Sequence, residues 1–210
     1  MKRILFGAVA LIICAISGVS TYKGIREQQI QKEIADSLIR FHVRANSDAD
    51  CDQELKLLVK DEIVKYLETE LSGAGTLDEA RAILEADVTD ITSIAESVIA
   101  REGYDYKVNA YFERAYFPLR MYGDMTFPPG EYEAFRVDIG NAAGRNWWCV
   151  LYPPLCFVDS TYSVVPDETK SDFRAVLSDE AYSTITVNDL TEKKYVIRFK
   201  YLKFLNNFFD

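Results

Sequence analysis

The only histidine of this 210-residue chain is His42, the one side chain whose ordinary pKa suits acid–base catalysis near neutral pH. Any Ser-His-Asp or Cys-His arrangement would need it as the base. It stands between Arg40 and Arg44, whose positive charges would lower its pKa, and no G-x-S-x-G motif follows. We therefore predict no catalytic residues, and a protein that is not an enzyme.

Metal and cofactor motifs are also missing from the sequence. There is no H-E-x-x-H and no C-x-x-C, and one histidine with scattered cysteines is a poor zinc set. The acidic run from Asp48 to Asp52 is similar to the start of a calcium loop, but Gln53 replaces its glycine and Val59 replaces its bidentate glutamate. We expect neither a metal nor a cofactor.

Three cationic or potentially cationic side chains, Arg40, His42 and Arg44, alternate along one predicted strand of an otherwise acidic chain. One interpretation is a recognition surface that meets an acidic patch on a partner. The alternative is an internal role, in which they pair with Asp138 or with a glutamate of a neighbouring strand.

Cys149 and Cys156 form the candidate disulfide. Seven residues of extended strand span about 23 Å, so a bond requires the chain to turn at Tyr152-Pro153-Pro154. Disulfides persist in exported proteins. The alternative is two buried free thiols, and both interpretations stay open. Beyond the predicted export segment, Cys51 is left over in either case.

The elements that position these residues begin with a strand over 38–45, where Ile39, Phe41 and Val43 alternate with the cationic side chains. Helical spacing of apolar residues then predicts a helix over 50–71 and a second apolar stripe that ends at Gly103. Between them, Thr76 and Glu79 have the form of a capping box. The two helices should form an antiparallel hairpin.

Alternation returns over 104–112 and 131–139, with a turn-rich stretch over 118–130 between them, and a short apolar strand is predicted over 147–152. The order predicts an α+β fold: a mixed sheet of about four to five strands with a helical hairpin on one face, preceded by an N-terminal hydrophobic export segment. Further on, the pattern predicts short helices over 173–177 and 178–182. It then fits either a strand over 195–201 before a terminal helical turn or helix throughout that last stretch.

The N-terminus has the pattern of an export signal. Lys2 and Arg3 precede a run without charge from Ile4 to Tyr22, so residues 1–22 are predicted to be a signal peptide or a membrane anchor that engages the membrane or the translocon. Residues 23–37 then form a polar spacer, and 38–210 a single domain. The net charge is −9, and −11 without those two cations, which argues against nucleic acid as a partner.

Several of these segments, LIRFHVRANSD, EYEAFRVDIG and NWWCVLYPPLCFVD, resemble the stage II sporulation protein R family of endospore-forming bacteria. The resemblance implies a signal secreted into the space between forespore and mother cell. There it would activate an integral-membrane aspartic protease of the neighbouring cell, which removes the pro-sequence of sigma factor E. The alternative function is an exported hydrolase that acts on cell-wall or peptide substrates.

Overall fold

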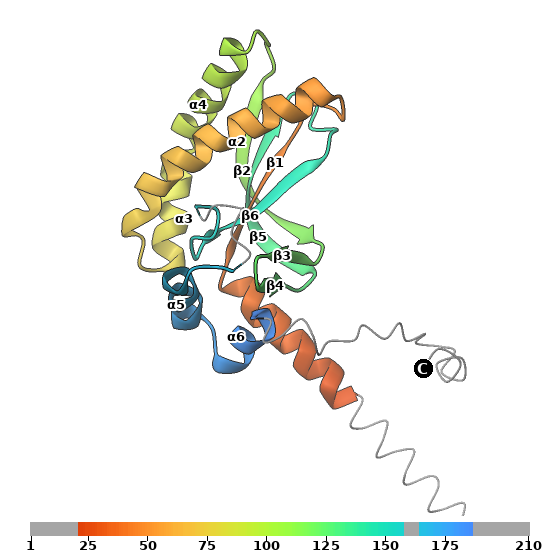
Figure 1. Ribbon diagram of the computed structural model, residues 1–210, viewed down its shortest axis with the longest axis vertical. Helices are drawn as coiled ribbons and strands as arrows, with labels where there is room; N and C mark the ends of the chain where they lie inside the picture. The colour runs from red at the N-terminus through yellow and green to blue at the C-terminus, as the bar shows by residue number, and fades with distance from the viewer. Residues whose placement is uncertain (1–20, 158–163, 187–210) are drawn as a thin grey trace, which may run out of the picture.

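The computed structural model describes residues 21–157 and 164–186, and its centre is a four-stranded sheet in the order β2-β5-β1-β6 (Figure 1). β1 is parallel to β5, and the other two pairings are antiparallel. The strands are β1 (Ile39–Arg44), β2 (Val108–Phe117), β5 (Gly130–Ile139) and β6 (Asn146–Tyr152). The predicted α+β class with a mixed sheet is confirmed.

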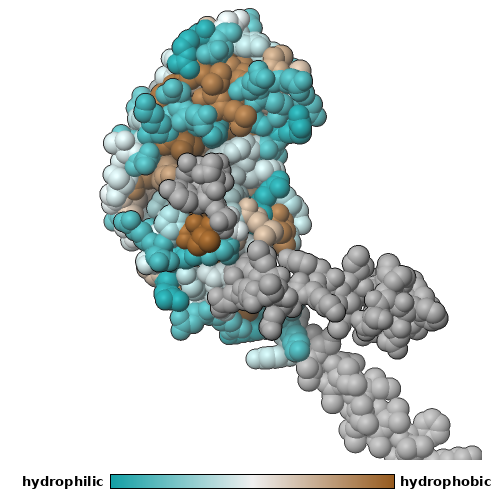
Figure 2. Space-filling view, in the orientation of Figure 1, coloured by the Kyte–Doolittle hydropathy of each residue, from teal (hydrophilic) through white to brown (hydrophobic). Residues whose placement is uncertain are grey.

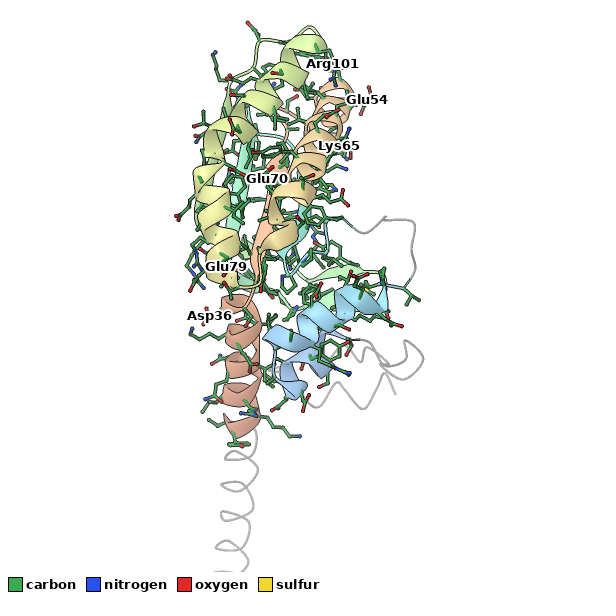
Figure 3. All side chains as sticks on the ribbon, turned by 90° about the vertical axis from the view of Figure 1, so that its left-hand side faces the viewer. Asp36, Glu54, Lys65, Glu70, Glu79 and Arg101 are labelled. Atoms are coloured by element: carbon green, nitrogen blue, oxygen red, sulfur yellow. The ribbon has the colours of Figure 1, made fainter. Side chains whose placement is uncertain are left out.

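A layer of helices covers one face of this sheet, as predicted (Figure 1). It consists of α2 (Asp50–Glu70), a short 3-10 turn (Leu71–Gly73), α3 (Leu77–Ala86) and α4 (Val88–Arg101). Ile39, Phe41 and Val43 of β1 point into this first core and meet apolar side chains of α2 such as Val59 and Ile63. Charged side chains such as Glu54, Lys65 and Arg101 lie on the helix layer (Figure 3).

The second apolar stripe is two helices rather than one, because the chain breaks its helical conformation at Asp87, the C-cap of α3 and N-cap of α4. The predicted cap is confirmed for Thr76, while Glu79 binds the amide of the residue before the N-cap rather than that of Thr76. The Thr76 hydroxyl accepts a hydrogen bond from the Glu79 amide at 3.2 Å, and the Glu79 carboxylate accepts one from the Gly75 amide at 2.8 Å.

A second layer, which the sequence pattern did not predict as such, covers part of the opposite face (Figure 1). It consists of a helix at 21–36, the hairpin of β3 (Arg120–Tyr122) with β4 (Met125–Phe127), α5 (Asp167–Val176) and α6 (Asp179–Ile185). The helix at 21–36 occupies most of the predicted polar spacer, and its last turn buries Ile34 and Ala35 in this second core.

Most of the apolar N-terminal run, and the strand predicted over 195–201, lie outside the described residues. Among the helices that the structure does describe, none combines the length and the apolar character needed to span a membrane. The division of the chain into an export segment, a spacer and one domain stays a prediction.

Candidate functional site

Arg40, His42 and Arg44 share the face of the sheet that points away from α2, as their alternation predicts, but they do not form an exposed row. Arg40 has 0% of its surface exposed and His42 only 2%, while Arg44 is half-buried. The expectation of an exposed recognition surface is therefore wrong for Arg40 and His42. The physical reason is the second layer, which covers the part of the sheet where these two side chains lie.

Arg40 lies in a cage of aromatic rings. Its guanidinium carbon is 4.6 Å from the centre of the Phe117 ring, 5.1 Å from Tyr132 and 5.3 Å from Phe127. It donates one hydrogen bond, from Nη2 to the Tyr122 hydroxyl at 3.2 Å. Within the described residues, no carboxylate pairs with it, and its Nε and Nη1 atoms are buried without a hydrogen-bond partner. The negative faces of the rings stabilise the buried charge in place of a counter-ion.

His42 belongs to a network of charged side chains contributed by three strands. Its Nε2 lies 3.1 Å from Oε1 of Glu113 on β2, and Arg136 on β5 donates to the same oxygen at 2.9 Å. Arg136 also donates to Asp138 at 2.7 Å, and Asp138 accepts a hydrogen bond from Tyr111 at 3.1 Å. The alternative of an internal role is seen for His42 alone, and its partner Glu113 lies on β2, two strands away, rather than on a neighbouring strand.

The network keeps His42 uncharged at neutral pH. Burial, followed by the positive charge of Arg136, lowers the pKa of His42 from 6.5 to about 4, while Glu113 acts in the opposite direction. Because the Glu113 carboxylate only accepts, the proton of the neutral ring is on Nε2. Nδ1 is left as a buried acceptor with no partner among the described residues.

The His42–Glu113 pair has the form of the base half of a hydrolytic triad, but no serine or cysteine of the described residues hydrogen-bonds to Nδ1. The described residues also contain no group of three or more His, Cys, Asp or Glu side chains able to hold a metal ion. The arrangement links β1, β2 and β5 to one another through side chains.

Trp147 and Trp148 of edge strand β6 go to opposite faces of the sheet. Trp147 packs edge-on against Phe41 at 5.8 Å, under the Lys60 ammonium of α2 at 5.1 Å. The Trp148 ring stacks on His42 at 5.1 Å and lies beneath the Arg120 guanidinium at 5.3 Å. Consecutive tryptophans thus anchor this strand in both cores.

A groove of about 520 Å³ follows β6, between α2 and the β3–β4 hairpin. Both tryptophans line it, together with Cys149, Cys156 and Tyr122.

Apolar side chains also gather on the outer surface where α2 crosses the upper part of the molecule (Figure 2). The exposed large apolar residues of that helix are Leu57 and Leu58.

The chain turns after β6 as the candidate disulfide requires, and it brings Cys149 and Cys156 together. Both thiols donate to the carbonyl of Val150, at 3.8 Å and 2.9 Å respectively. The structure has them as free thiols, so the bond itself stays a prediction. Cys51, on the first turn of α2, is exposed and free.

Sequence reasoning missed most partners of the three cationic residues. Alternation within β2 and within β5 predicts the face of its own strand on which each of Glu113, Arg136 and Asp138 lies. It does not predict that the three side chains meet in one cluster. Their contact depends on the pairing of Arg136 with both His42 and Tyr111 in the register of neighbouring strands. Register between strands far apart in the chain has no signature in a single sequence.

Fold and site together define a small α+β protein in which one sheet face buries a network of charged and aromatic side chains. The family model for Stage II sporulation protein R matches residues 35–162, more than half of the chain. The chain therefore belongs to the stage II sporulation protein R family, and membership supports a role in sporulation.

One relative is Stage II sporulation protein R of Bacillus subtilis (strain 168), which is 40% identical over 126 residues. The aligned part is 60% of this chain and 56% of the relative, so the match spans little more than half of the relative's length. No solved structure matches the chain. The whole sheet and its polar network fall within the family match, whereas α5 and α6 lie beyond it.

Proposed function

We propose that this protein is an exported signal of endospore formation, secreted into the space between forespore and mother cell. It activates an integral-membrane aspartic protease of the neighbouring cell, and that protease processes the pro-form of sigma factor E. The observation that carries this proposal is the family match over residues 35–162, which contains the whole sheet. The positively charged start and the uncharged run from Ile4 to Tyr22 support the export step.

A role as a ligand rather than an enzyme is supported by the state of the best candidate base. His42 is uncharged and buried, and its free ring nitrogen has no nucleophile as a partner among the described residues. A catalytic base needs to reach the proton that it removes. We therefore assign the chemistry to the receptor and the recognition to this chain.

The test is co-production of this chain with the candidate protease and the pro-sigma substrate in a host that does not sporulate. We expect processing of the substrate only when chain and protease are both present. Processing by this chain without the protease would favour the exported hydrolase instead. No processing when all three proteins are present and folded would refute the signalling role.

The export step is tested in the same host with charges placed in the apolar run. Ala10→Asp combined with Leu11→Asp should retain the protein inside the cell and abolish processing, because two carboxylates interrupt the hydrophobic region of the signal. Cell fractionation locates the variant. Full processing by a variant that fractionates with the cytoplasm would contradict export.

A further inference from the structure

Four hydrogen-bond donors converge on one backbone carbonyl at the end of β6. The amides of Leu155 and Cys156 both donate to the Val150 oxygen at 3.1 Å, and the thiols of Cys149 and Cys156 donate to the same atom. A carbonyl oxygen has two lone pairs, and a thiol is a weak donor. The two amides are therefore sufficient to satisfy this oxygen, and loss of both S–H donors costs little.

The two sulfur atoms are also close to each other. Both contact the Val150 carbonyl oxygen, Cys149 at 3.8 Å and Cys156 at 2.9 Å, in a site where Cys149 is only 4% exposed. Cys149 is fixed within the strand, and the turn through Pro153 and Pro154 returns Cys156 to it. The fold of the reduced chain thus brings the two thiols to one site, as a disulfide requires.

We propose that Cys149 and Cys156 form an intramolecular disulfide in the exported protein, which ties the turn after β6 to the edge of the sheet. The step is thiol–disulfide exchange with an oxidised thiol–disulfide oxidoreductase or a small disulfide such as oxidised glutathione. One cysteine thiolate attacks the oxidant and forms a mixed disulfide, and the second thiolate displaces the reduced carrier. The chain loses two electrons and two protons, and the oxidant is reduced to two thiols.

The order of events follows from the same geometry. Burial raises the pKa of the Cys156 thiol well above its ordinary value, and the guanidinium of Arg40 counteracts this only in part. Since the thiolate is the nucleophile, the folded reduced protein should oxidise slowly. The bond therefore forms while the chain folds, once the turn has brought the two cysteines together and before the thiols are buried.

This inference rests on the export step of the proposed function, because cytoplasmic thiols are kept reduced. Its test does not. The full chain is refolded in a buffer of reduced and oxidised glutathione, then denatured in an alkylating reagent and digested with trypsin. No lysine or arginine lies between Arg145 and Lys170, so both cysteines are released on one peptide.

We expect this peptide to resist alkylation and to be lighter than the reduced peptide by two hydrogen atoms, while the exposed Cys51 is alkylated. Reduction should lower the Tm of the refolded protein by roughly 5–10 °C, since the bond closes a short loop. Cys149→Ala combined with Cys156→Ala should abolish this redox-dependent difference, whereas the control Cys51→Ala should retain it. Alkylation of both cysteines after refolding in the oxidised buffer would overturn the proposal, whatever the result of the processing assay.

Discussion

Mild acid should destabilise this protein through His42. The folded protein holds the pKa of His42 at about 4, against 6.5 for an exposed histidine. Between these two values the unfolded chain binds a proton that the folded chain does not, so the free energy of unfolding falls as the pH decreases. Above pH 6.5 both states are neutral and this effect vanishes.

The magnitude follows from the two pKa values. Linkage gives a loss of about 2 kcal/mol on going from pH 8 to pH 5, and about 3 kcal/mol once the pH is below 4. His42 is the only histidine, so no other imidazole contributes in this window. Asp172 acts in the opposite direction, because burial and Glu168 raise its pKa and the folded state then gains stability as the pH falls.

The assay is urea unfolding of the wild type and of His42→Gln at several pH values from 8 to 5. Glutamine keeps a donor for Glu113 and cannot be protonated. The free energy of unfolding of the variant should fall by no more than about 0.5 kcal/mol between pH 8 and pH 5, which is the size of effect usual for a surface substitution. Parallel curves for the two proteins would show that His42 is not held neutral by burial and Arg136, and would refute the reasoning.

Three further predictions concern Arg40, Arg44 and Thr76. Arg40→Met should leave the free energy of unfolding unchanged or raise it by about 1–4 kcal/mol, because it fills the cage without a buried charge. Arg40→Ala should lower the free energy of unfolding by about 3–5 kcal/mol. Equal losses for Arg40→Met and Arg40→Ala in thermal or urea unfolding would contradict the prediction. Arg44→Gln should reduce receptor activation about fivefold, the equivalent of about 1 kcal/mol for one charge contact, while Arg101→Gln on the helix layer leaves it unchanged. Equal activation by both folded variants would remove Arg44 from recognition. Thr76→Ala should lower the free energy of unfolding by about 1 kcal/mol, and Thr76→Ser should leave it almost unchanged. Equal stability of the two variants would show that the cap contributes no stability.

Periodicity predicted what a single element determines by itself. The alternation around His42 predicted a strand, which the structure has at Ile39–Arg44. It also predicted the face on which the cationic side chains of that strand lie. Thr76 and Glu79 gave a helix start because the capping box is local, with partners only three or four residues apart. The sheet and its helical cover were accessible from the sequence for the same reason.

Periodicity failed where an element is too short or too polar to show it. β3 and β4 contain three residues each, fewer than an alternating pattern needs, so the region over 118–130 was interpreted as turns. The helix at 21–36 is polar apart from a few isoleucines, and it joins the second core through Ile34 and Ala35, with Ile30 packed against that core. These elements are most of the second layer, and without them the face of Arg40 and His42 looks open.

The burial of Arg40 shows why exposure cannot be inferred from the side of a strand alone. Arginine is almost never fully buried unless it is paired, which made an exposed cationic row the natural expectation. Here the compensation comes from four aromatic rings on four different strands: Phe117 on β2, Tyr122 on β3, Phe127 on β4 and Tyr132 on β5. Each ring is unremarkable in its own segment, and only the tertiary fold gathers them around one guanidinium. A cation that looks suited to a receptor therefore belongs to the second core. Of the three cationic side chains, only the half-buried Arg44 stays a candidate for recognition.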